Sequence, residues 1–162
     1  MSSFKNWTDY QQRLNFIFHA IVAVTMLPFV WLYLEIDTDR REGVFDDPVI
    51  LILFLLICIS LSLTSFLYKK KQLETIPNSN SMRDKLINYQ RIMIVAYALI
   101  EGAALFATIA FYLTANYVFV LVYISTLFAF SLGRPSLDRI SRDLKLSKEN
   151  REVLINRDPI PD

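Results

Sequence analysis

The stretch Ile92–Leu113, IMIVAYALIEGAALFATIAFYL, decides the fold because it is apolar throughout except for one acid, Glu101, near its centre. A helix needs roughly 20 apolar residues to cross the ~30 Å hydrocarbon core of a bilayer, and this stretch is long enough. A carboxylate at the bilayer midplane costs at least ~2.5–3.5 kcal/mol, so such a residue is expected to face protein or water. The stretch therefore predicts a transmembrane helix with a functional residue at mid-depth.

Three further apolar blocks accompany this one in a chain that is 54% hydrophobic and only 20% charged. The four predicted spans are residues 14–34, 48–68, 92–113 and 117–132. The first three are long enough to cross a bilayer, whereas the fourth, at roughly 24 Å of helix, is short for a span. We predict an all-α integral membrane four-helix bundle over residues 1–133, followed by a short amphipathic helical tail over residues 134–162.

The basic residues are distributed unevenly between the two sides of the predicted bundle. Of the 17 Lys and Arg residues, only Arg40 and Arg41 lie between the first and second spans, and none lies between the third and fourth. All others lie in regions that a four-span protein places on one side. Because cytoplasmic loops carry an excess of Lys and Arg, we expect both termini in the cytoplasm. The plasma membrane, or the inner membrane of a bacterium, is the favoured location.

Local signals mark where the predicted helices begin and turn. Asp47-Pro48 is typical of a helix start, and Asn80 or Ser81 is expected to begin a helix near Met82, before the third span enters the bilayer. Only Thr114-Ala115-Asn116 separates the third and fourth spans. A connection this short predicts an antiparallel hairpin, so these two helices are expected to be neighbours.

The third span is predicted to carry two adjacent faces, one polar and one of small residues. Positions three and four apart share a helix face, so Tyr97 and Thr108 line up with Glu101. His19 in the first span is a further candidate, because at ~1.5 Å per residue it lies only ~6 Å from Glu101 in depth. These four residues are the candidates for a proton or ion site. The alternative is that His19 is hydrogen-bonded within the bundle or near the interface, and that Tyr97 and Thr108 are packing residues. The second face is predicted to allow close helix packing, and it consists of Ala96, Ala103, Ala107 and Ala110.

The segment ALIEGAALFATIAFYL (residues 98–113) resembles the carboxylate-bearing helix of the proteolipid subunit of rotary ATPases. The shared features are a mid-membrane acid, small residues beside it and an aromatic end. The resemblance implies that Glu101 carries an ion in a multimeric ring. It is confined to this span, and the glycine-rich partner helix of that subunit is absent, since the three glycines are Gly43, Gly102 and Gly133. From the residues alone, Glu101 is equally compatible with a structural role as a protonated acid that holds helices together.

Two further features are expected to contact lipid or a partner. Lys69-Lys70-Lys71 follows the second span and suits anionic lipid head groups. In the tail, the apolar residues Leu137, Ile140 and Leu144 share one face of a short helix. That face is expected to lie on the membrane surface, pack under the bundle or dock a cytoplasmic protein. Neither feature indicates binding to nucleic acid.

Enzyme motifs are absent from the sequence. A single histidine and a single cysteine, Cys58, exclude a disulfide framework and the usual zinc patterns, and no nucleotide-binding loop is present. We therefore predict no catalytic residue, metal or cofactor, and we do not expect an enzyme, with a membrane-embedded enzyme as the remote alternative.

Two functions remain open from the sequence. The leading hypothesis is an oligomeric channel, carrier or ion-coupled subunit in which Glu101 binds a proton or a cation. The alternative is an accessory or assembly protein, in which Glu101 is structural and residues 134–162 hold a cytoplasmic partner. The expected partners are the lipid bilayer and either a second copy of the chain or another membrane subunit.

Overall fold

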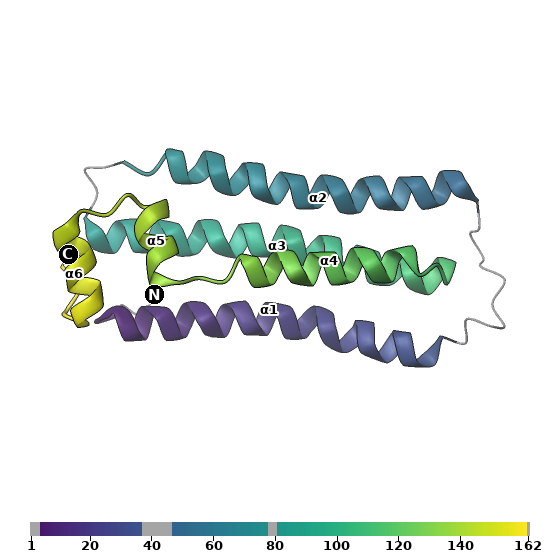
Figure 1. Cartoon of the computed structure of the whole chain (residues 1–162), viewed down its shortest axis with the longest axis horizontal. Helices are drawn as coiled ribbons and strands as arrows, with labels where there is room; N and C mark the ends of the chain where they lie inside the picture. Colours follow the sequence, from purple (N-terminus) through teal and green to yellow (C-terminus); the bar gives the residue numbers. More distant parts are fainter. Residues whose placement is uncertain (1–3, 37–46, 78–80, 162) are drawn as a thin grey trace.

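The computed structural model describes residues 4–36, 47–77 and 81–161, and the regular elements in these ranges are six helices. Four long helices lie side by side, and two short ones gather at the end of the bundle where both termini lie (Figure 1). We name this the terminal end and the opposite one the loop end. The helices are α1 (Trp7–Glu35), α2 (Pro48–Glu74), α3 (Met82–Thr114), α4 (Val118–Leu132), α5 (Leu137–Asp143) and α6 (Lys148–Asn156).

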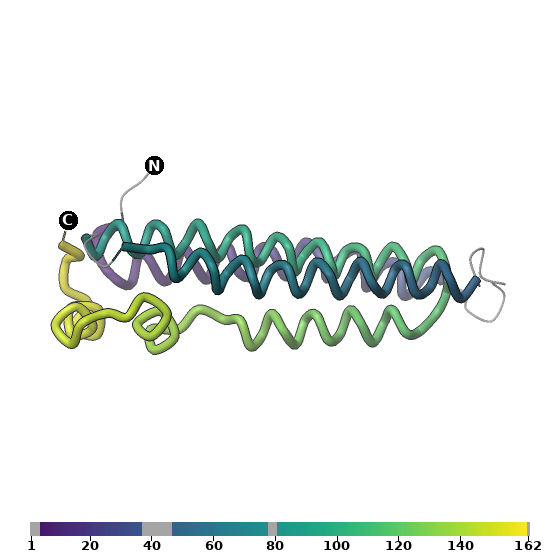
Figure 2. The backbone as a smooth tube through the Cα atoms, turned by 90° about the horizontal axis from the view of Figure 1, so that it is seen from above, coloured from purple at the N-terminus to yellow at the C-terminus, as the bar shows by residue number. Residues whose placement is uncertain are grey.

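Helix α3 is the centre of the bundle. It packs against α1, α2 and α4. In its most apolar stretch of 18 residues, 44% of the residues are buried, compared with 17% in α1 and 11% in α2. Helices α1, α3 and α2 form one layer, and α4 lies on one side of that layer (Figure 2). One side of α3 is therefore covered by α4, and the other is not.

Three helices, α1, α2 and α3, are long and apolar enough to cross a membrane. Helix α4 has 15 residues, and it reaches the same criterion only together with α5, from which it is bent by 82°. The prediction of a helical chain with long apolar segments is thus confirmed. Helices α2 and α3 extend beyond their predicted spans toward the terminal end, and the α3–α4 connection is as short as expected.

The predicted helix starts are confirmed where the structure describes them. The side chain of Asp47 accepts a hydrogen bond from the Val49 N–H, and Pro48 occupies the first turn of α2. Ser81 caps α3 by accepting from the Asp84 N–H. Asn80, like the two arginines of the first loop, lies outside the described residues.

Small side chains let α2 and α3 approach each other closely. The hydroxyl of Ser65 on α2 donates to the backbone carbonyl of Ala96 at 2.7 Å, and the thiol of Cys58 lies 3.7 Å from the carbonyl of Ala103. Hydrogen bonds from one helix to the backbone of the next require near contact of the two backbones. The four alanines predicted to pack, at positions 96, 103, 107 and 110, are all buried.

The described part of the tail, residues 134–161, packs under the bundle at the terminal end. Its apolar residues join a core that also contains residues of α1 and α3. The tail contributes Ile140, Leu144, Leu154 and Ile160 to this core, and they meet Tyr10, Leu14, Leu86 and Tyr89 among others. Of the three arrangements open to the tail from the sequence, the structure has the one in which it covers the chain's own helices.

Backbone contacts hold the two ends of the chain together. Asn6 and Pro159 form an antiparallel bridge, and the Ile160 N–H donates to the Lys5 carbonyl at 3.1 Å. The Arg83 guanidinium at the start of α3 donates to the Ile160 carbonyl at 3.1 Å. The terminal end is therefore a folded cap built from both ends of the chain and the start of α3.

A substitution at Ala103 tests the close packing of α3. Ala103→Leu inserts a large side chain at a position with no exposed surface, and overpacking of this kind costs about 1–3 kcal/mol. Ala23→Leu, at an exposed position of α1, is the matched control. Thermal unfolding in detergent is expected to show a lower melting temperature for Ala103→Leu alone, and equal melting temperatures for the two variants would contradict this packing.

Candidate functional site

The side of α3 that faces away from α4 carries a line of exposed and half-buried residues, which we call the uncovered face. Its members recur every three or four residues and therefore share one face of the helix. Ile94, Ile109 and Tyr112 are 36%, 49% and 40% exposed. The uncovered face consists of Ile94, Ala98, Glu101, Leu105, Ile109 and Tyr112. The only acid of the third span thus lies on the side of the central helix that none of the described helices covers.

Glu101 occupies the middle of this face. Its side chain is half-buried, and in the described part of the chain it has no hydrogen bond and no ion pair. In a helix long and apolar enough to span a bilayer, a carboxylate in this position is expensive unless something outside the chain meets it. This is the observation on which the functional proposal depends.

Tyr97 is one turn from Glu101 but serves a different contact. It is buried, and its hydroxyl donates to the Gly133 carbonyl at 2.9 Å, where α4 ends. Its ring packs edge-on against Phe18 of α1 at 5.5 Å between centroids, and it also meets Phe130 of α4. The structure therefore places Tyr97 as a link between three helices, with its hydroxyl turned to the backbone of α4.

Thr108 and His19 lie apart from Glu101 in different ways. Thr108 is buried, and its hydroxyl donates to the Ala104 carbonyl of its own helix at 2.9 Å. His19 follows Phe18, so it lies level with Tyr97, about one helical turn from Glu101 along the bundle. Its side chain is exposed, however, and its ring contacts that of Phe18 at 5.4 Å. Among the described residues, Glu101 forms no hydrogen bond or ion pair with either of them.

A polar cluster separate from Glu101 lies at the terminal end and joins α2, α3 and α5. The Lys69 ammonium of α2 forms an ion pair with the Asp143 carboxylate of α5 at 3.0 Å, and both side chains are largely buried. The Tyr89 hydroxyl of α3 donates to the same carboxylate oxygen at 3.3 Å. Lys70 and Lys71 are exposed. Of the three consecutive lysines, the first therefore fastens the tail to the bundle.

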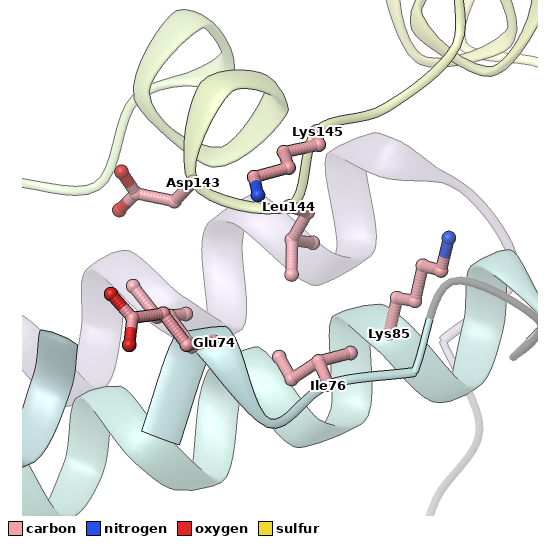
Figure 3. A pocket seen from close by; sticks show the side chains of 7 residues that line it. Glu74, Ile76, Lys85, Asp143, Leu144 and Lys145 are labelled. Carbon is pink, nitrogen blue, oxygen red and sulfur yellow. The ribbon is translucent and has the colours of Figure 1, made fainter. Parts of the chain in front are cut away.

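A small pocket of about 130 Å³ adjoins this cluster, between the tail and the α2–α3 connection. Asp143, Leu144 and Lys145 reach it from the tail, and Glu74, Ile76 and Lys85 from the opposite side (Figure 3). The negative charges of Glu74 and Asp143 balance the positive charges of Lys85 and Lys145, so these four residues give the pocket no net charge. Among the described residues, no group of three His, Cys, Asp or Glu side chains could hold a metal ion.

The apolar tail residues predicted to meet lipid or a partner lie inside the chain's own core. Ile140 and Leu144 are 1% and 5% exposed, and Leu137 is half-buried against the same core. These apolar side chains therefore pack against the chain's own core.

Three polar residues, the buried Tyr89 and the half-buried Asp143 and Asn15, escaped the sequence analysis. Tyr89 and Asp143 meet across 54 positions of sequence, and no local spacing indicates such a pair. Asn15 lies in the first predicted span, and its side-chain oxygen is buried with no partner in the described residues. An asparagine inside an apolar block is a signal that the sequence does contain.

Comparison of the chain with protein-family models, with curated proteins and with solved structures gave no match.

The environment of Tyr89 generates a prediction about alkaline pH. Burial, and then the neighbouring carboxylate of Asp143, raise the pKa of Tyr89 above its ordinary value. A raised folded-state pKa contributes stability that is present below the unfolded-state pKa, about 10, and is lost as the pH rises through the folded-state value. By about pH 11 this loss is on the order of 1 kcal/mol.

Melting temperatures measured between about pH 9 and pH 11 are therefore expected to fall more steeply for the unmodified protein than for Tyr89→Phe. Tyr33→Phe removes an exposed tyrosine hydroxyl on α1 and is the control for the loss of a tyrosine as such. Parallel declines in the unmodified protein and Tyr89→Phe would show that the Tyr89 phenol is not responsible.

Proposed function

We propose that this chain is a four-span integral membrane protein with both termini in the cytoplasm. The three long apolar helices support insertion in a membrane, and α4 completes the fourth span although it covers only about 22 Å. Both termini and the α2–α3 connection, with nearly all Lys and Arg residues, belong to one end, which supports a cytoplasmic terminal end. The plasma membrane, or a bacterial inner membrane, fits this orientation.

In this membrane the protein acts as an oligomeric, ion-coupled subunit. The carrying observation is that Glu101 lies mid-helix on the uncovered face, half-buried and without a partner in the described residues. A second copy of the chain, or another membrane subunit, seated on this face shields the carboxylate from lipid. A carboxyl group held at such an interface is able to bind and release a proton or a small cation.

Among the described residues, the inside of the bundle offers few free polar atoms: the buried Tyr123 hydroxyl and the Asn15 side-chain oxygen have no hydrogen-bond partner. The buried hydroxyls of Thr25, Thr108 and Thr114 each donate to a backbone carbonyl of their own helix, at 2.7 to 3.0 Å. The centre of the bundle is otherwise filled by aromatic and alanine side chains. These features support an ion site between subunits over one within the bundle.

The alternative is a non-catalytic accessory subunit in which Glu101 only holds the interface together. The tail of such a subunit meets a cytoplasmic partner through its charged exterior, since its apolar residues are occupied. An exposed salt bridge between Arg151 and Asp138, at 2.6 Å, joins α6 to α5 on that exterior.

Glu101→Gln and Glu101→Asp separate these functions. In nanodiscs and proteoliposomes, the ion-coupled function predicts that both variants assemble like the unmodified protein. Glu101→Gln then loses proton or cation flux, because it cannot ionise, while Glu101→Asp keeps a part of it. A strict monomer, or undiminished flux in Glu101→Gln, would contradict the proposal. Loss of assembly in Glu101→Gln, with no flux in any form, would favour the accessory subunit.

A further inference from the structure

A lateral groove runs between α2 and α4 on the side of the bundle away from the uncovered face. Helices α2 and α4 both pack on α3, and the space between them is open to the surroundings. Two hollows, of about 610 and 380 Å³, follow one another along it and share Ser62, Phe66 and Ala129. Their sizes fall in the range of small-molecule sites, roughly 300–1,000 Å³.

The wall of this groove is effectively apolar. Three of its hydroxyls already donate to backbone carbonyls: Ser62 to Cys58 at 3.0 Å, Ser65 to Ala96 at 2.7 Å and Ser125 to Leu121 at 2.8 Å. The remaining lining is mostly aliphatic and aromatic, as with Leu63, Phe66 and Leu121. A chain of methylene groups suits such a wall better than water or an ion does.

Among the described residues that line the groove, the charged ones are Lys69 and Arg139, at its terminal end. The Lys69 ammonium is paired with Asp143 at 3.0 Å, and the Arg139 guanidinium donates to the Leu132 carbonyl. A guanidinium has five N–H donors and an ammonium three, so both groups keep donors in reserve. Two cations against one acid leave one positive charge, which matches the single net negative charge of a phospholipid whose head group carries no cation.

We propose that the α2–α4 groove binds an anionic phospholipid, with an acyl chain along Ser62, Phe66 and Ala129 and the phosphate at Lys69 and Arg139. Basic pockets between transmembrane helices on the cytoplasmic side are suited to anionic head groups. The inference depends on the membrane orientation of the proposed function but not on Glu101. The lipid site and the ion site are therefore tested by different measurements.

The test compares two lipids in vesicles of phosphatidylcholine that contain the full chain. Spin-labelled phosphatidylglycerol and spin-labelled phosphatidylcholine are added in turn, and the motionally restricted fraction gives their relative affinity. The proposal predicts a preference for phosphatidylglycerol. Each basic residue near a membrane surface is worth about fivefold in affinity for anionic lipid.

Two double variants carry the same loss of charge. Lys69→Gln with Arg139→Gln removes the pair in the groove, and Lys70→Gln with Lys71→Gln removes two exposed charges beside it. The first is expected to lose at least about fivefold more of the preference than the second. Equal losses, or no preference in the unmodified protein, would overturn the proposal, because general attraction to the surface would then account for the lipid contacts.

A groove-filling variant keeps the test decisive if loss of the Lys69–Asp143 ion pair unfolds the tail. Ser62→Phe blocks the groove and is expected to abolish the preference, whereas Ser60→Phe, exposed on α2 outside the groove, leaves it unchanged. Unaltered preference in Ser62→Phe contradicts the proposal. So does efficient disulfide cross-linking between copies through Ala129→Cys in a Cys58→Ala background, since a second chain would then occupy the groove.

Discussion

The packing of α3 against its neighbours is the constraint on which the rest of the structure depends. Alanines allow α2 to come close enough for Ser65 to bond the backbone of α3, and aromatic rings fill the space toward α1 and α4. Once these sides of α3 are packed against other helices, the uncovered face remains outside the packed core. Glu101 is on that face, so its position follows from which residues of α3 pack inward.

The terminal end depends on the same helix. The first turns of α3 bind the C-terminal segment through Arg83, and its next turns bind the tail through Tyr89 and Asp143. Lys69 adds a contact from α2 to the same carboxylate. The tail is thus a fixed cap, and the basic end of the α2–α4 groove is built from this cap and from α2. The proposed lipid site there and the proposed ion site on the opposite side of α3 therefore depend on the same packing of α3.

The helical class and much of α3 were predictable from sequence, because apolar length and helical spacing are local properties. Ser81 and Asp47-Pro48 marked helix starts for the same reason. The spacing placed Tyr97 and Thr108 near Glu101 on a helical wheel but did not reveal which contact each side chain makes. The buried Tyr97 hydroxyl donates to the backbone carbonyl at the end of α4, and the buried Thr108 hydroxyl donates to a carbonyl of its own helix. The tail's position under the bundle rests on contacts with Tyr10 and Leu86, far away in sequence, which no local pattern encodes.

The central claim, that another protein subunit covers the uncovered face of α3, is tested most directly with a spin label at Ala98, one turn from Glu101. A second label at Leu56, on the exposed outer side of α2, reports a position that faces lipid. Both variants carry Cys58→Ala and are reconstituted in vesicles, and collision rates of each label with oxygen are measured. The account predicts a low rate at Ala98 and a high rate at Leu56. Equally high rates at the two positions would contradict it, because Glu101 would then face lipid.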